Sequence, residues 1–382
     1  MSRPKHQFVR DYIQNSIDSG HFVPGDQLPT DDELSERLSV SRPTIARAMR
    51  DLEQLGLIRR RVGAGTFVEA KSSESEQRLG LLIPELGNTE IFEPVCAEIA
   101  RTVQPFGYSL LWGDAGVVND SNTKEGRLAV SAERAERACK SFIDEGVTGV
   151  FFVPMVSTQQ DKDADRRILD RLDEAGIAVV LLDRDVAQFP ERSSYDLVTV
   201  NHLSGQLKLC EHLLKSGRKR IAYLQWPGTS DSMEQRLAGY QLALVRAGQV
   251  FNPEWVHQGD ARDHEFIGQI LSDYNPDAFT CENDVVAAHL MQTLNTLGVS
   301  VPDEIAVVGF DDVKYAQLLA VPLTTIRQPC AQLGEVAVRL MNSRISAPHM
   351  PARTVQLESE LIVRKSCGVA AKDEPAISRE IQ

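Results

Sequence analysis

Seven short apolar runs recur along the chain after residue 78, and a segment with helical spacing of apolar residues follows most of them. The runs cover residues 79–83, 108–112, 149–153, 178–182, 197–200, 220–224 and 305–310. Continuous apolar runs are typical of parallel strands buried on both faces, and intervening helices are typical of an α/β fold. A region of this length exceeds what one core commonly holds, so the pattern predicts two α/β lobes.

The first 68 residues show a different pattern, which predicts three helices. Phe8, Val9, Tyr12, Ile13 and Ile17 share one face at helical spacing and predict a helix near 5–18. Thr30 and Glu33 have the spacing of a capping box, so a second helix starts after Thr30. Ser41 is suited to cap a third helix, and Pro43 is tolerated in its first turn.

The third predicted helix separates an apolar face from a basic face. At 100° per residue, Ile45, Met49 and Leu52 fall together. On the opposite side fall Pro43, Arg47 and Arg50, with Arg42 at the N-terminal tip. Two helices joined by a tight turn, the second of them basic on its outer face, form a helix-turn-helix that places its second helix in the major groove of DNA.

A glycine-tipped hairpin follows this helix. Residues 57–61 and 66–68 are able to pair around the sequence VGAG. Gly63 and Gly65 permit positive φ and close approach of the backbone to another molecule. Beside a recognition helix, such a hairpin is a wing whose tip contacts phosphates or a minor groove, although a solvated charge run is the simpler interpretation of any single arginine here.

Charge is distributed unevenly along the 382 residues. The whole chain has a formal net charge of -13, yet residues 1–70 hold ten Lys or Arg and ten Asp or Glu. The rest of the chain therefore carries the entire negative excess, which repels DNA at long range. Any contact with DNA must come from a small, locally basic face.

Several classes of protein are disfavoured by what the sequence lacks. The six cysteines are far apart without a C-x-x-C pair, which favours reduced thiols in a cytoplasmic protein. The histidines form no metal-binding cluster, and the sequence has neither a secretory signal nor an apolar run of membrane-spanning length. Residues 69–78 are polar and predict a linker, and 366–382 predict a disordered tail.

Residues 8–68 resemble the GntR-type winged helix-turn-helix. The resemblance rests on PGDQLPTDDEL and on VSRPTIARAMRDLEQLGLIRRRVGAGTFV. Together with the helix faces, it implies that DNA is bound by Ser41, Arg42, Pro43, Thr44, Arg47, Arg50, Arg61, Gly63, Gly65 and Thr66. Asp32 and Ala46 depart from the pattern, because many relatives have Arg at both positions. Base preference is therefore not transferable.

The region from about 78 to 364 resembles the sensor domain of LacI-type regulators, which has the type I periplasmic-binding-protein-like fold. The motifs are IAVVLLDRD, HLLKSGRKRIAYL, QRLAGYQLAL, FTCENDVVAAHLMQTLNTLGVSVPDEIAVVGFDD and VPLTTIRQP. A GntR-type head on a LacI-type body resembles the arabinose-repressor class. The implied organisation is a DNA-binding domain at 1–68, a linker at 69–78 and a two-lobed domain at 79–365 for effector binding and dimerisation.

Polar residues at strand ends are the candidate effector ligands. Asp183 and Asp311 each end an apolar strand, and ligands of open α/β folds bind at the carboxyl ends of strands. Family positions extend the set to Phe92, Asp183, Arg184, Arg236, Asn283, Asp311 and Gln328. Carboxylates, amides and guanidinium groups suit sugar hydroxyls, and an aromatic ring suits the apolar face of a sugar. Asp284 is expected to be a helix N-cap and Trp226 is a weaker candidate, while Ala261 is small where many relatives have an aromatic residue.

These observations predict a cytoplasmic, homodimeric transcription regulator that represses carbohydrate genes and leaves a pseudo-palindromic operator when a sugar binds. No cofactor, metal or membrane partner is expected, and the chain is not expected to be an enzyme. A regulator of similar build that responds to a purine or a phosphorylated metabolite is the alternative. An enzyme fusion that uses pyridoxal phosphate is less favoured, because it needs a Schiff-base lysine in a larger transferase fold.

Overall fold

The computed structural model describes residues 5–18, 22, 25–54, 57–61, 65–68, 77–83, 90–113, 124–155, 158–227 and 230–369. The chain divides into two compact units, Met1–Gln77 and Arg78–Gln382, which we call the head and the body. Most of the predicted linker lies outside the described residues. Its last two residues, Gln77 and Arg78, are not linker, because they begin strand β3 (Gln77–Leu82), at which the division between the two units falls.

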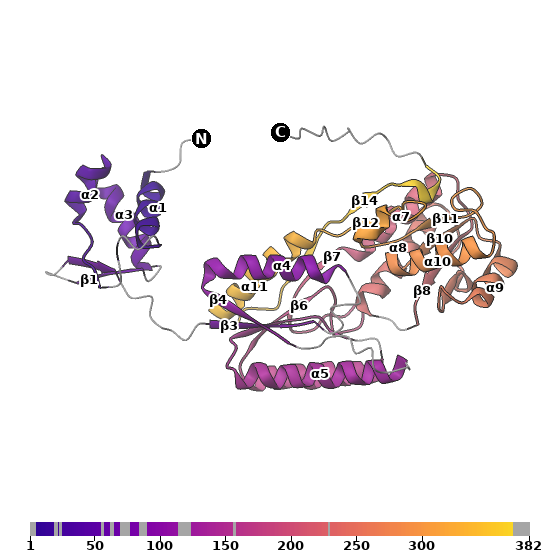
Figure 1. Cartoon of the computed structure of the whole chain (residues 1–382), viewed down its shortest axis with the longest axis horizontal. Coiled ribbons are helices and arrows are strands. Elements are labelled where there is room, and N and C mark those ends of the chain that lie inside the picture. The colour runs from indigo at the N-terminus through magenta and orange to yellow at the C-terminus, as the bar shows by residue number, and fades with distance from the viewer. Residues whose placement is uncertain are drawn as a thin grey trace. The chain divides into compact units, whose positions relative to one another are not determined.

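The head contains the three predicted helices (Figure 1). They are α1 (Lys5–Asp18), α2 (Asp31–Leu38) and α3 (Arg42–Gln54). The predicted capping box is confirmed, since Thr30 Oγ1 accepts from the Glu33 N–H and Glu33 Oε2 accepts from the Thr30 N–H at 2.7 Å. Ile45, Met49 and Leu52 of α3 are fully buried, so the predicted apolar face forms the core of the head.

The predicted hairpin is present as β1 (Ile58–Arg61) and β2 (Gly65–Val68), which pair antiparallel. The stretch before α2 is hydrogen-bonded to β2, with an isolated bridge between Gln27 and Phe67. Gly65 has φ +112°, and a Cβ at this position would lie 2.3 Å from the Gln27 side-chain nitrogen. Glycine is therefore required where β2 begins. The tip of the hairpin, with Gly63, lies outside the described residues.

The body consists of two α/β lobes, as predicted. The elements of the first lobe are β3 (Gln77–Leu82), α4 (Phe92–Val103), β4 (Tyr108–Trp112), α5 (Lys124–Asp144), β5 (Gly149–Phe152), α6 (Gln159–Glu174), β6 (Ala178–Leu182), β7 (Asp196–Val200), α11 (Cys330–Ser346) and β13 (Thr354–Leu357). Those of the second lobe are α7 (His202–Lys215), β8 (Ile221–Gln225), α8 (Asp231–Arg246), β9 (Val256–Gln258), α9 (His264–Tyr274), β10 (Ala278–Cys281), α10 (Asp284–Thr296) and β11 (Ala306–Val308).

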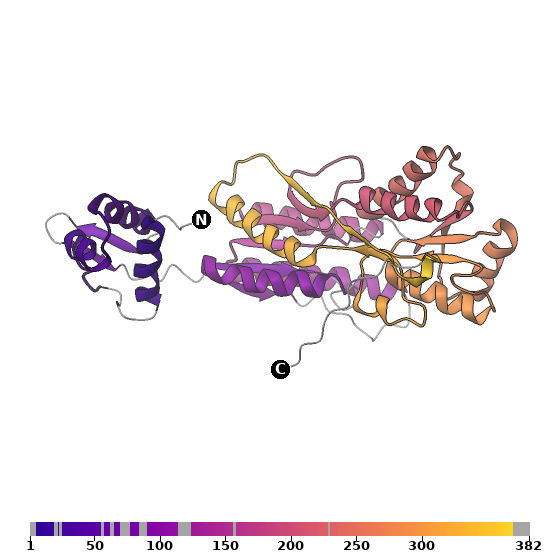
Figure 2. The ribbon, with the colours of Figure 1, turned by 90° about the horizontal axis from the view of Figure 1, so that it is seen from above.

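The first lobe is a three-layer sandwich around a six-stranded sheet of order β13-β7-β6-β5-β3-β4. Helices α4 and α11 lie against each other on one face, and α5 covers the other face with α6 (Figures 1 and 2). Buried apolar residues of the strands alternate between the two helix layers, as in Leu81 toward α4 and Leu82 toward α5. This explains why the strand sequences are continuously apolar.

The second lobe repeats the plan with a four-stranded sheet of order β11-β10-β8-β9. Its parallel strands are covered by α7 and α8 on one face and by α9 and α10 on the other. The chain passes from the first lobe to the second after β7, returns between β11 and α11, and passes to the second lobe again after β13. A short antiparallel pair, β12 (Thr325–Arg327) with β14 (Glu360–Ile362), lies along these connections.

The predicted tail begins too early. Ser366 and Cys367 are buried in the short helix η4 (Lys365–Cys367), which packs against β11. The Ser366 hydroxyl donates to the Val307 carbonyl at 2.6 Å and accepts from the Thr324 N–H at 2.8 Å. These bonds hold residues 366–369 to the second lobe, and the remainder of the predicted tail lies outside the described residues.

Candidate functional site

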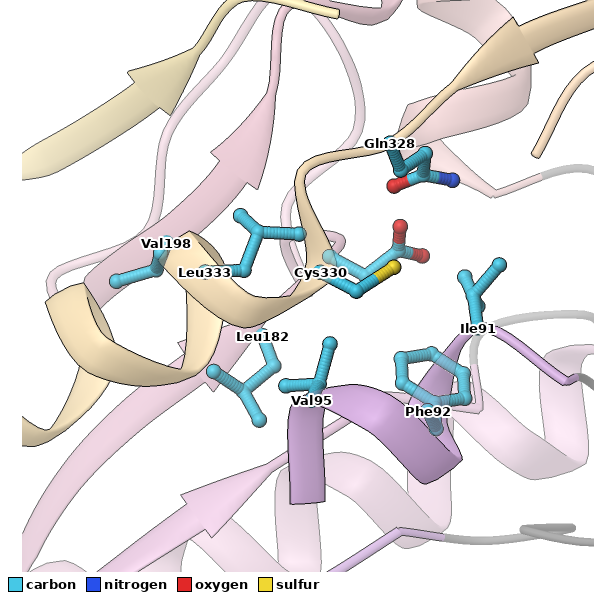
Figure 3. A pocket seen from close by; sticks show the side chains of 9 residues that line it. Ile91, Phe92, Val95, Leu182, Val198, Gln328, Cys330 and Leu333 are labelled. Carbon is cyan, nitrogen blue, oxygen red and sulfur yellow. The ribbon is translucent and has the colours of Figure 1, made fainter. Parts of the chain in front are cut away.

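A pocket of about 270 Å³, including the open space at its mouth, lies in the first lobe between α4 and α11 at the carboxyl ends of β6 and β7. The lining residues are Ile91, Phe92, Val95, Leu182, Asp183, Val198, Gln328, Cys330 and Leu333. Figure 3 shows Phe92 and Val95 on α4 facing Cys330 and Leu333 across the pocket, with Gln328 at one side. Three of the predicted effector residues, Phe92, Asp183 and Gln328, therefore meet in one pocket.

Asp183 supplies the charge of this pocket directly after β6. Its backbone is left-handed, with φ +68°, and its side chain is buried. The Arg184 Nε donates to Asp183 Oδ2 at 3.0 Å, and His202 Nε2 lies 3.6 Å from Oδ1. Burial raises the pKa of Asp183, but the charges of Arg184 and Arg236 and the hydrogen bond from Arg184 outweigh this effect, so the pKa is lower than usual. The carboxylate is thus ionised and fixed.

Arg236 is buried at 2% exposure and joins the groups behind the pocket. From α8 its Nε donates to His202 Nδ1 at 3.2 Å, and its Nη1 donates to the Glu282 carbonyl. Its Nη2 lies 3.3 Å from Asp311 Oδ1, and its guanidinium carbon lies 3.7 Å above the Phe310 ring. A buried guanidinium with a partner at each of its three nitrogens is a rigid support for the acids around it.

His202 is a neutral part of this support. Burial, followed by the charge of Arg236, lowers the pKa of His202 to about 3. Because the Arg236 Nε is a donor only, His202 Nδ1 accepts, and the ring proton is assigned to Nε2. That nitrogen lies 3.2 Å from the Thr199 hydroxyl and faces Asp183. His202 therefore connects the acid of the first lobe to the arginine of the second.

Asp311 lies three residues beyond the end of β11 and has an unusual backbone, with φ +120°. Its Oδ1 accepts from Gln328 Nε2 at 2.7 Å and also faces Arg236. Burial raises the pKa of Asp311 to about 6, against the opposing effect of Arg236. A non-glycine residue held in this region of φ costs of order 1–3 kcal/mol, and such strain is concentrated at functional sites. Asp183 and Asp311 share this feature.

The prediction that Asp284 is the N-cap of α10 is wrong. Asn283 has the extended backbone of a cap, and its Oδ1 accepts from the Val286 N–H at 2.9 Å. Asp284 is the first helical residue, and its carboxylate accepts from the Thr325 hydroxyl at 2.6 Å and the Val313 N–H at 3.0 Å. The Asn283 carbonyl oxygen is thus committed to the helix, and its amide nitrogen lies 3.5 Å from Glu282 Oε1.

Other residues singled out in the sequence lie away from the lining. Trp226 is half-buried and carries the Arg262 guanidinium 5.5 Å from its ring centre. Ala261 is fully buried in the core of the second lobe, where a larger side chain has no room without rearrangement. The neighbour of Asp311 in the chain, Asp312, also lies outside the lining and forms ion pairs with Arg327 and Arg364, each at 2.7 Å.

Most of the predicted DNA-reading residues lie on α3 and β2 of the head. Arg42, Pro43, Arg47 and Arg50 are exposed, while Thr44 and Thr66 are half-buried. Ser41 precedes α3, and its hydroxyl lies 2.9 Å from that of Thr44. Arg50 bends back, so that its Nε donates to the Ala46 carbonyl at 3.3 Å. The backbone of Arg61 ends β1, opposite Gly65.

Comparison with known families assigns both units. Residues 5–68 match the bacterial regulatory proteins of the gntR family, and residues 210–367 match the periplasmic binding protein-like domain. The HTH-type transcriptional repressor PurR of Mannheimia succiniciproducens is 30% identical over 281 residues, which cover 72% of this chain and 77% of that protein.

The chain belongs to the family of HTH-type transcriptional repressors that includes PurR.

A further relative and a solved structure each match most of the regulator's length. The arabinose metabolism transcriptional repressor of Geobacillus stearothermophilus is 26% identical over 381 residues, covering 95% of this chain and 97% of that protein. A solved structure titled transcriptional regulator CelR-cellobiose complex superimposes with a TM-score of 0.63 at 21% identity, covering 89% of this chain and all of that one. The structural likeness shows that the fold is shared.

Sequence reasoning missed several residues that the regulator places at this site. His202 and Glu282 also follow strands β7 and β10, so their positions carried the same signal as those of Asp183 and Asp311. No sequence pattern pointed to Cys330 and Leu333. They lie on α11, which is more than a hundred residues after β7 in the chain and meets the pocket only in the folded structure. In the described part of the regulator, no group of His, Cys, Asp or Glu could hold a metal ion, and no helix is long and apolar enough to cross a membrane.

Proposed function

We propose that the regulator represses genes of carbohydrate use and leaves its operator when a small, uncharged sugar occupies the pocket beside Phe92 and Asp183. In this proposal residues 1–68 read the DNA, and residues 79–365 bind the sugar and form the dimer. The observation that carries it is the pairing of an aromatic ring with fixed polar groups at the carboxyl ends of strands. An apolar surface with a few convergent polar groups is what a sugar requires.

The polar groups divide between the two lobes in a way that favours closure. Asp183 belongs to the first lobe, and Asp311 and Arg236 belong to the second, while Gln328 lies on the connection between them. A ligand that bonds to groups of both lobes favours the closed arrangement through its differential affinity for that arrangement. A 100-fold loss of operator affinity requires about 2.7 kcal/mol of coupling between sugar and DNA.

The charges of the pocket favour a sugar over a phosphorylated metabolite. Asp183 is ionised, and the two arginines nearest to it are committed to carboxylates, Arg184 to Asp183 and Arg236 to Asp311. A phosphate would therefore meet carboxylates whose positive partners are already in use. A regulator of similar build that responds to a purine is the second candidate.

The proposal includes a homodimer, a pseudo-palindromic operator and action in the cytoplasm, where operator DNA is accessible. Helix-turn-helix proteins commonly bind as two-fold dimers to paired half-sites. Regulation of this kind needs no catalytic step and no pyridoxal phosphate. Sedimentation of the protein alone and with DNA measures the stoichiometry, and an absorbance spectrum tests for a cofactor band.

A thermal-shift screen identifies the effector class. The panel contains arabinose, ribose, cellobiose, sugar phosphates and purine bases. A ligand at 100 times its dissociation constant adds about 2.7 kcal/mol to the free energy of unfolding. Operator affinity is then measured with and without the best ligand. Equal affinities at saturation would refute the proposed release, and stabilisation by purines alone would select the second candidate.

A further inference from the structure

Two acidic residues lie among the arginines of the head. Asp31 and Asp32 form the first turn of α2 together with Glu33, whose carboxylate completes the capping box with the N-cap residue Thr30. Asp32 Oδ1 lies 2.5 Å from the Nε of Arg42, the first residue of α3. Asp31 accepts from Arg60 Nη2 of β1 through both oxygens, at 3.0 and 2.9 Å. One helical turn thus contacts both the predicted recognition helix and a strand of the wing.

Stability does not account for the pair between Asp32 and Arg42. Their side chains are 61% and 71% exposed, and ion pairs this exposed contribute little to folding. A carboxylate on a surface that approaches DNA also opposes binding, because it repels phosphates and reduces counterion release. We therefore expect Asp32 to lower the general affinity for DNA. A role in sequence specificity would explain why an acid stands at this position.

The ion pair with Asp32 orients the guanidinium group of Arg42. Asp32 is the one charged partner of Arg42 among the residues that the structure describes. It lies against Nε, which leaves both terminal nitrogens of the guanidinium for another acceptor. An arginine that presents two parallel N–H groups matches the O6 and N7 atoms of guanine in the major groove. Holding the side chain beforehand reduces the conformational entropy lost on binding.

We propose that Asp32 is a specificity-determining residue, which positions Arg42 to read one guanine of the operator. Arg42 makes the contact and Asp32 acts through it. The inference rests on Arg42 lying on the DNA-reading face, as proposed for the head. Arg47 provides a comparison on the same helix, since it is exposed and has no charged partner among the described residues.

The test uses the full-length chain and DNA sites selected from a library of random duplexes. Wild type, Arg42→Ala, Asp32→Ala and Asp32→Asn are compared. Glu36→Ala is the matched control, because it removes an exposed acid from the same helix. In wild type and the control we expect one position at which guanine is required. Both Asp32 variants and Arg42→Ala should lose that requirement and keep the others.

Dissociation constants then quantify the effect on the selected duplex and on a duplex with that G·C pair changed to A·T. We expect wild type to favour the first by about 5- to 150-fold, the range for a bidentate pair. The Asp32 variants should reduce this ratio toward one and bind the changed duplex at least as tightly as wild type, since a negative charge is gone. The isosteric Asp32→Asn variant keeps the size of the side chain.

Other outcomes separate the possible failures. If the Asp32 variants bind both duplexes more tightly by one common factor, Asp32 only repels DNA and the inference is wrong. A common weakening on both duplexes, with a lower melting temperature, would assign Asp32 a structural role and also overturn it. If Arg42→Ala changes neither the selected sites nor the affinity, the placement of Arg42 on the reading face fails.

Discussion

Exchanging Asp311 for Asn tests the pocket with a small perturbation. The amide oxygen of Asn can still accept from Gln328 and Arg236, so the supporting contacts are retained and only the negative charge is lost. A hydrogen bond to a charged acceptor contributes about 1.5–3 kcal/mol, against about 0.5–1.5 kcal/mol for a neutral one. We therefore expect sugar affinity at pH 8 to fall roughly 5- to 15-fold.

The dependence of this loss on pH gives the sharper readout. Burial raises the pKa of Asp311 to about 6, so the free protein protonates this carboxyl below that pH. A sugar hydroxyl that donates to the ionised form lowers the pKa in the complex. Wild-type affinity should then be constant above pH 7 and weaken by up to tenfold per unit below pH 6, with release of a proton on binding. The Asn variant should lack this weakening.

Calorimetric titrations at pH 5, 6, 7 and 8, in two buffers that differ in ionisation enthalpy, measure both affinity and proton release. Glu282 must be controlled, because burial raises its pKa to about 7 and it titrates in the same window. A Glu282→Gln variant that keeps the wild-type profile assigns the effect to Asp311. If wild type and Asp311→Asn show parallel profiles, Asp311 does not accept from the effector. Unchanged operator affinity without sugar verifies that the head is intact.

Three further predictions concern the head and the stability of the body. Arg42→Ala should weaken operator binding about 5- to 150-fold in mobility shifts and leave sugar affinity unchanged, and an unaltered operator affinity would contradict its place on the reading face. Asp196→Ala should destabilise the body by about 3–5 kcal/mol in thermal unfolding, because Arg344 and Arg353 lose their buried partner. Burial raises the pKa of Asp196, but the two arginines lower it by more, so the pKa is below its usual value. The difference in free energy of unfolding between wild type and Asp196→Ala should therefore be largest at pH 7 and shrink as the pH falls below about 4. Gly65→Ala should cost about 1–3 kcal/mol through its positive φ and weaken operator binding in the same mobility shifts, and equal affinity would show that β2 tolerates a Cβ.

The sequence predicted those strands that are buried on both faces. The run AVVLL at 178–182 is β6 residue for residue, because a central parallel strand has helices above and below. Two of the edge strands, β13 and β9, were missed, whereas the apolar edge strands β4 and β11 were predicted. β13 alternates between exposed and half-buried positions over TVQL, and β9 is only three residues long, so neither contains an apolar run. Their places are set by neighbouring strands, which single-sequence patterns do not reveal.

The site residues that could be predicted are polar residues that closely follow an apolar strand. Asp183 and Asp311 follow apolar strands, and the structure places both behind or within the pocket. The partners of a residue were not predictable. His202 lies between Asp183 and Arg236 because two lobes meet there, and no local spacing encodes that meeting. The role of Asp284 was misjudged for a related reason, since its carboxylate is held by Thr325 and Val313 from later elements.

The left-handed backbone at Asp183 and Asp311 has a consequence for directed evolution. Glycine adopts φ values of +68° and +120° without the penalty that a side chain incurs, so Gly at either position relieves about 1–3 kcal/mol of strain. The same change removes the carboxylate that faces Arg184 at position 183 or the buried Arg236 at position 311, and the loss of a buried partner costs about 3–5 kcal/mol. A selection for heat resistance alone should therefore keep both acids, although neither is the residue that suits its backbone best. A durable biosensor can thus be bred from this scaffold by selecting for stability without giving up the two acids assigned to the pocket.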